Sequence, residues 1–110
     1  RDIINRGSIK INPTDVESIL ARHPAIVLAA IVPMPDEALG ERSCLFATLL
    51  PGETLDFAAV TVFLADTDVA KLQWPEHLVV VEDMPMTPTK KIIKSELQKM
   101  VGEVRFSARA

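Results

Sequence analysis

Residues 25–32 form an unbroken apolar run rich in isoleucine and valine. Such a run is typical of a central strand that is buried on both of its faces. Residues 33–41 contain two prolines and a glycine and are predicted to form a loop. Residues 42–50 are predicted to form a second long strand, which ends at Pro51-Gly52. Two strands joined by so short a connection are expected to be antiparallel.

Helices are predicted to cover this pair of strands. Asn12 is a good N-cap and Pro13 suits the first helical position, and the helix that they open is predicted to end at His23, before a proline. Asp56 is predicted to cap a second helix and Ser95 a third. All three segments place apolar residues at helical spacing.

The remaining segments complete the expected fold class. Residues 2–11 predict two short extended pieces that turn at Gly7-Ser8, and residues 77–81 predict another strand. The order is hairpin, helix, strand, strand, helix, strand, loop, helix. This order predicts an α+β fold: a small domain with a central antiparallel sheet of about three strands flanked by helices, plus an N-terminal two-stranded hairpin.

Composition bounds the class of protein. The 110 residues suit one domain spanning 1–110, with a weakly patterned tail at 103–110 that is expected to fray. The net charge of −3, with both signs interleaved, argues against a nucleic-acid binder. No apolar run approaches the roughly 18 residues of a membrane span. The chain begins abruptly at Arg1, inside patterned sequence, so we expect a piece of a larger protein.

The single cysteine, Cys44, falls inside a predicted strand and is expected to be a small buried hydrophobe rather than a nucleophile. It has no partner for an internal disulfide, and no zinc-binding spacing is present. The sequence therefore predicts no metal site and fits a reducing, cytoplasmic setting.

Residues 85–94 form a stretch with a chemical signature. Pro85 and Pro88 stiffen the backbone ahead of two consecutive lysines, Lys90 and Lys91, which precede the last predicted helix. The helix dipole disfavours cations at this end, so local helix energetics does not explain the lysines. A stiff arm that presents a cation suits a phosphate or a carboxylate. The same residues also fit a solvated basic loop, and runs of charge are often just surface.

Four stretches, in order, resemble motifs of one known family. Residues 2–13 resemble its interdomain loop, D-x-I-x-x-G-G-x-x-I-x-P, and residues 16–24 resemble its helix motif E-V-E-x-x-L-x-x-H-P. Residues 32–41 resemble V-x-x-P-D-x-x-x-G-E, and residues 85–94 resemble P-x-T-x-x-G-K-I-x-K. Together they make the chain similar to the small C-terminal domain of acyl-adenylate-forming enzymes, the AMP-dependent ligase superfamily that includes acyl-CoA synthetases. The resemblance covers roughly residues 1–98.

The resemblance implies roles for particular residues. Lys91 matches the adenylation lysine, which binds the substrate carboxylate and the α-phosphate of ATP. Arg1, with Asp2 beside it, falls at the hinge about which the domain rotates between its two half-reactions. Gly7 and Ser8 match the loop that lines the pantetheine channel of coenzyme A. The implied cofactors are ATP, with Mg in the full enzyme, and coenzyme A, none of which this domain is expected to bind alone.

The chain departs from the family pattern at two positions that matter. Lys90 stands where the pattern has a glycine, which implies backbone strain of about 1 kcal/mol if that position needs a positive φ. Gln73 stands where many relatives carry a lysine, which leaves Lys71 as the candidate contact for a coenzyme A phosphate. Ser8 also replaces a second glycine of the pattern.

The implied function is that of a mobile C-terminal domain in an ATP-dependent, AMP-forming ligase that joins a fatty or aryl acid to coenzyme A. Its first partner would be its own N-terminal adenylation domain, because the chain has no glycine-rich phosphate loop. The fragment alone is therefore expected to be an inactive monomer, with no nucleic-acid partner. Two alternatives remain open: a free-standing ferredoxin-like binding or regulatory module, and part of an adenylation domain that serves a carrier protein.

Overall fold

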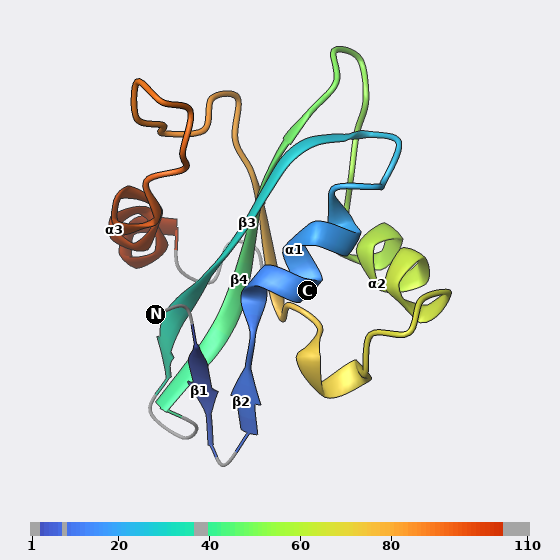
Figure 1. Cartoon of the computed structure of the whole chain (residues 1–110), viewed down its shortest axis with the longest axis vertical. Coiled ribbons are helices and arrows are strands. Elements are labelled where there is room, and N and C mark those ends of the chain that lie inside the picture. The colour runs from blue at the N-terminus through green and yellow to red at the C-terminus, as the bar shows by residue number, and fades with distance from the viewer. Residues whose placement is uncertain (1–2, 8, 37–39, 105–110) are drawn as a thin grey trace.

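Two long antiparallel strands form the centre of the domain (Figure 1). The computed structural model describes residues 3–7, 9–36 and 40–104. Strand β3 (Ile26–Asp36) pairs with β4 (Gly40–Leu49) from Ile26↔Leu49 to Asp36↔Gly40. The antiparallel pairing predicted for this part of the chain is confirmed.

Strand β4, and not β3, occupies the central position. One edge of β4 pairs with β3, and its other edge pairs with β5 (His77–Val80), from Cys44↔His77 to Ala47↔Val80. The β4–β5 pairing is parallel, so the sheet is mixed. The connection between these strands carries a helix, as a parallel crossover needs, and this places β5 alongside β4 in the same direction. The α+β fold class is confirmed, and the expectation that every strand is antiparallel is corrected.

The N-terminal hairpin extends this sheet. Strands β1 (Ile4–Arg6) and β2 (Ile9–Ile11) pair antiparallel, and β1 joins β4 at Arg6↔Gly40. Gly7 follows β1 with a φ of 63°, in the left-handed region that glycine adopts without steric cost. The hairpin predicted for residues 2–11 is confirmed over residues 4–11.

In the part of the chain that the structure describes, three α-helices and one short 3₁₀ helix complete the fold. Helix α1 (Pro13–Leu20) begins with the side chain of Asn12 accepting a hydrogen bond from the Thr14 amide, and α2 (Phe57–Ala65) begins with Asp56 accepting one from the Ala59 amide. The 3₁₀ helix η1 (Lys71–Gln73) precedes β5, and α3 (Lys94–Val104) ends the described chain. None of these helices is long and apolar enough to cross a bilayer.

Two helix boundaries differ from the sequence predictions. Helix α1 ends at Leu20 rather than His23, and His23 instead forms a turn in which its Nδ1 accepts a hydrogen bond from the Ala25 amide, 3.0 Å away. Its ring makes an edge-to-face contact with the ring of Phe63 in α2, so His23 has a structural role here. Helix α3 begins at Lys94, which places Ser95 within the first turn and not at the N-cap.

The alternating side chains of β3 and β4 divide the interior into two cores. Ile31 and Leu45 lie in one core, and their neighbours Val32 and Phe46 lie in the other. Helices α1 and α2 close the first core, while α3 closes the second from the opposite side of the sheet (Figure 1). The first core consists of Ile4, Ile11, Val16, Leu20, Ile26, Ile31, Leu45, Val60 and Leu64. The second consists of Ala30, Val32, Met34, Cys44, Phe46, Met84, Leu97 and Val101.

Strand β3 continues through two prolines that were predicted to lie in a loop. The Ile31 amide points away from β4, because it donates to the side chain of Glu17 at 2.7 Å. Pro33 and Pro35 have the same parity as Ile31 in an unshifted register, so their missing N–H groups also face away from the ladder. Because β3 is an edge strand, these prolines remove no hydrogen bond from the sheet. The predicted loop is therefore wrong over residues 33–36, which belong to β3, and over residues 40–41, which belong to β4, while residues 37–39 lie outside the described part.

Cys44 lies inside the second core with 2% of its surface exposed, as predicted for a buried hydrophobe. Burial raises the pKa of its thiol to about 12, so the reactive thiolate is nearly absent at neutral pH.

We expect Cys44 to resist thiol reagents in the folded protein. An aromatic disulfide reagent at pH 8 should react at least about 100-fold more slowly with the native chain than with the same chain in denaturant, because both access and thiolate are lacking. The absorbance of the released thiolate measures both rates. Rapid stoichiometric labelling of the native chain would contradict the buried position.

Candidate functional site

The stretch that carries the two lysines folds as a small hairpin (Figure 1, orange). Met86 and Ile92 form an isolated antiparallel bridge at its base, and the Ile93 amide donates to the Pro85 carbonyl at 2.9 Å. Near the tip, the Thr87 amide donates to the Lys91 carbonyl at 2.8 Å. A three-residue loop, 88–90, joins the two arms.

Lys90 is the last residue of this loop and has a φ of 68°. Its amide donates to the Thr87 carbonyl at 2.8 Å, which closes a β-turn. A turn followed by a left-handed residue is a common way to close a three-residue hairpin loop, and glycine is the usual choice there. Among the described residues, Lys90 is the one non-glycine with a positive φ. The strain predicted for Lys90 on the basis of the family pattern is therefore present in the backbone.

Thr87 fixes the backbone of the residue that follows Lys90. Its Oγ1 accepts a hydrogen bond from the Lys91 amide at 3.1 Å and lies 3.0 Å from the Oγ1 of Thr89. Both the backbone amide and the backbone carbonyl of Lys91 are thus hydrogen-bonded, and the residue is exposed to solvent. An ammonium group on a fixed backbone, free of burial, is suited to meet an anionic ligand that approaches from outside the domain.

The residues predicted to contact coenzyme A belong to a second region. Gly7 lies exposed at the turn of the β1–β2 hairpin, and Lys71 lies exposed at the start of η1. The predicted residues Ser8, Arg1 and Asp2 lie outside the described part of the chain.

Gln73 ties these two elements together. Its side-chain amide donates from Nε2 to the Lys10 carbonyl and accepts at Oε1 from the Asn12 amide, each at 3.3 Å. The amide thereby pairs with the backbone at the end of β2, much as another strand would. The residue that departs from the family pattern therefore has a structural reason to be present. The Lys91 loop lies at the far end of the molecule from this hairpin (Figure 1).

Sequence reasoning missed an ion pair that links two of the motifs. The Nζ of Lys94 lies 2.7 Å from the Oε2 of Glu17, which joins the first residue of α3 to α1. Both residues stand in the stretches that resemble family motifs, but a local pattern does not reveal a contact between positions so far apart in the chain. A second pair, between Arg42 and Glu76 at 2.8 Å, links β4 to the segment before β5.

The described residues contain no group of three or more His, Cys, Asp and Glu side chains arranged to hold a metal ion.

Comparison with known proteins decides the family. The AMP-binding enzyme C-terminal domain model matches residues 15–91, a range that ends at Lys91. The chain belongs to this family.

Curated relatives agree with this assignment. The chain is 45% identical over 100 residues to the medium-chain fatty-acid–CoA ligase of Escherichia coli, covering 90% of this chain and 18% of that enzyme. It is 36% identical over 104 residues to the 2-hydroxy-7-methoxy-5-methyl-1-naphthoate–CoA ligase of Streptomyces carzinostaticus, covering 94% of this chain and 19% of that enzyme. The chain thus spans about a fifth of the length of these relatives.

Solved structures share the fold. Apo MatB from Rhodopseudomonas palustris superposes with a TM-score of 0.85 at 25% identity, over 94% of this chain and 21% of that one. Apo MbtA from Mycobacterium smegmatis superposes with a TM-score of 0.83 at 32% identity, over 90% of this chain and 19% of that one.

The strained turn generates a prediction about stability. We expect Lys90→Gly to raise the free energy of unfolding by about 0.5–1 kcal/mol, because relief of the left-handed strain outweighs the extra freedom of glycine in the unfolded chain. Chemical denaturation of the domain measures this change. Lys90→Ala is the matched control, since it keeps the β-carbon and the strain and should change stability little. Equal stabilisation by both variants would assign the effect to repulsion between the two lysines instead.

Proposed function

We propose that this chain is the mobile C-terminal domain of an ATP-dependent, AMP-forming ligase that couples a fatty or aryl acid to coenzyme A. The family assignment supports the ligase class. The names of relatives include both fatty-acid and aryl-acid CoA ligases, and one related structure is described as ATP-bound. The partner of the domain would be the large N-terminal domain of the same cytoplasmic enzyme.

The observation that carries the proposal is the left-handed residue directly before Lys91. The family pattern has a glycine followed by the lysine, and the position with positive φ here is Lys90. This supports an alignment in which Lys91, not Lys90, is the adenylation lysine. A shift by one residue would put the pattern's glycine at an ordinary backbone position and leave the strained position without an explanation.

The chemistry of adenylation suits a cation held as Lys91 is. A carboxylate oxygen attacks the α-phosphorus of ATP, pyrophosphate leaves, and the acyl-adenylate remains. Negative charge is concentrated around the phosphorus between two anionic groups. An ammonium placed beforehand lowers the energy of this arrangement, because no solvent needs to reorganise at the moment of reaction.

The second half-reaction would use the other end of the domain. There the coenzyme A thiol replaces AMP on the acyl carbon. We propose that Gly7 and Ser8 line the path of the pantetheine arm, that Lys71 faces a coenzyme A phosphate, and that Arg1 and Asp2 form the hinge. The Lys91 loop and the β1–β2 hairpin lie at opposite ends of the domain (Figure 1), an arrangement that suits a domain rotation between the two steps.

A second candidate differs in the acceptor. The names of several relatives describe acid–AMP ligases, among them the 2,3-dihydroxybenzoate-AMP ligase of Bacillus subtilis, at 38% identity over 104 residues. In that case the thiol in the second step would belong to a carrier protein, and the assignment of Lys91 would be unchanged.

Replacement of Lys91 tests the first half-reaction. In the full-length ligase, Lys91→Ala should slow adenylation by roughly 10²–10³-fold, the usual effect of losing one preplaced charged donor. Release of pyrophosphate measures this step, and thioester formation from supplied acyl-adenylate should continue. The control is Lys90→Ala, which should be mild, and the 110-residue chain alone should release no pyrophosphate. Loss of adenylation in Lys90→Ala with full activity in Lys91→Ala would show that the alignment is shifted by one.

Replacement of Gly7 tests the second half-reaction. In the full-length ligase, Gly7→Trp should slow thioester formation by roughly 10²-fold, because the indole would obstruct the approach of the thiol. The acyl-adenylate should still accumulate. Gly7→Ala is the matched control, since it introduces the same strain at a positive φ without the bulk. An equal loss in both half-reactions would contradict the assignment of this loop.

A further inference from the structure

One partner of the ion pair between Glu17 and Lys94 follows the proposed catalytic loop directly in the sequence. Lys94 comes three residues after Lys91 and opens α3. A single oxygen of Glu17, Oε2, lies 2.7 Å from the Lys94 Nζ and 2.7 Å from the Ile31 amide nitrogen. One carboxylate therefore connects α1, the free edge of β3 and the start of α3.

Local energetics does not explain a lysine at this position. The N-terminal end of a helix carries partial positive charge, so the first residue of α3 is a poor place for a cation. The side chains of Lys94 and Glu17 are 23% and 18% exposed, so both charges are largely withdrawn from water. A partly buried charge needs a partner, and each of these residues supplies one for the other.

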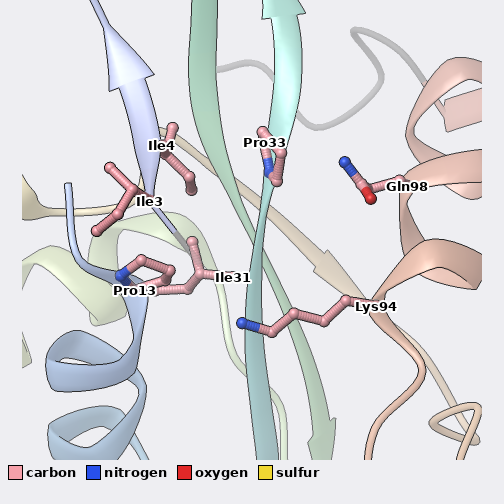
Figure 2. A pocket seen from close by; sticks show the side chains of 7 residues that line it. All are labelled: Ile3, Ile4, Pro13, Ile31, Pro33, Lys94 and Gln98. Carbon is pink, nitrogen blue, oxygen red and sulfur yellow. The ribbon is translucent and has the colours of Figure 1, made fainter. Parts of the chain in front are cut away.

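A cavity beside the ion pair increases the influence of this contact on the position of α3. About 120 Å³ of space lies between β1, the start of α1, β3 and α3, with Ile3, Pro13, Pro33, Lys94 and Gln98 among the lining residues. Figure 2 shows Lys94 extending from α3 along this space toward Ile31 on β3. Close packing does not fill the gap between α3 and the start of α1, and the ion pair spans it.

Backbone contacts next to Lys94 connect the start of α3 to the base of the loop. Ile93, the residue before Lys94, is hydrogen-bonded to Pro85 at the base of the loop, and Ile92 is bridged to Met86. The loop and the first turn of α3 therefore move together. Met86 and Ile92 also pack against the second core, so the loop should stay folded without the ion pair but shift in position.

We propose that Glu17, acting through Lys94, is a positioning residue for Lys91 in the adenylation step. This inference rests on the function proposed above. Glu17 contacts Lys94 and the Ile31 amide, and it acts on Lys91 through Lys94. Its effect is to hold α3, and with it the backbone that presents the Lys91 ammonium, in one place relative to α1 and β3.

Two nearly isosteric variants of the full-length ligase test the proposal. Glu17→Gln keeps an amide oxygen for the Ile31 amide but removes the charge that faces Lys94. Lys94→Met keeps most of the side-chain length but removes the ammonium. Each should slow adenylation by about 10-fold, since displacements of about 1 Å at a reacting centre cost up to roughly 100-fold. Pyrophosphate release measures this step, and thioester formation from supplied acyl-adenylate should stay within about twofold of the parent enzyme.

The double variant and a control on the same helix complete the experiment. Adenylation by the double variant, Glu17→Gln with Lys94→Met, should be no slower than by the slower single variant, because the two changes remove the same contact. Lys99→Met should leave both steps unchanged, since Lys99 is 74% exposed in a loose pair with Glu96 at 3.7 Å.

Several outcomes would overturn the inference. A purely structural role would reduce the amount of folded enzyme and slow both half-reactions equally. If the fold-losses in adenylation rate of the two single variants multiplied in the double variant, the two residues would act separately. Normal adenylation in Glu17→Gln, with Lys91→Ala severely impaired, would remove the positioning role and leave the proposed function intact. Normal adenylation in Lys91→Ala would instead refute the proposed function of the loop itself.

Discussion

The two-faced burial of the β3–β4 ribbon is the constraint on which the rest of the domain depends. Successive residues of each strand point into different cores, so neither face can be left to solvent. Helices α1 and α2 satisfy one face and α3 the other. The hydrophobic gain from each face is available only when its helices are in place, which makes the small domain depend on all three. The functional loops are attached to the ends of these obligatory elements, and their positions follow from the packing.

The free edge of β3 shows how a local sequence feature and a distant side chain solve one problem together. An exposed strand edge presents unpaired amides. Pro33 and Pro35 remove two of these donors, and Glu17 accepts a hydrogen bond from the Ile31 amide. Strand β3 can therefore stay long, although it lies at an edge and contains residues that usually end strands.

Much of this fold was predictable because local chemistry determined it. Asn12 and Asp56 cap helices as their side chains suggest, and Gly7 turns the hairpin. The errors arose where tertiary contacts decide. Nothing local distinguishes a proline in a loop from one whose missing N–H faces outward on an edge strand, and nothing local shows that β5 joins β4 in parallel. For the site, the family pattern predicted strain at Lys90, which the backbone has. The contact between Glu17 and Lys94 joins residues far apart in the chain and left no local sign.

The amide of Gln73 gives the two ends of the domain different sensitivities to the solution around them. The two hydrogen bonds that it makes between η1 and the β1–β2 hairpin involve no charged group. Dissolved ions and moderate changes of pH therefore have little effect on these hydrogen bonds. The tie at the other end is an attraction between opposite charges that still touch water. Because this pair is in direct contact and mostly buried, salt screens it less than an exposed pair, so rising ionic strength weakens the hold of α3 on α1 only modestly while the hairpin keeps its place.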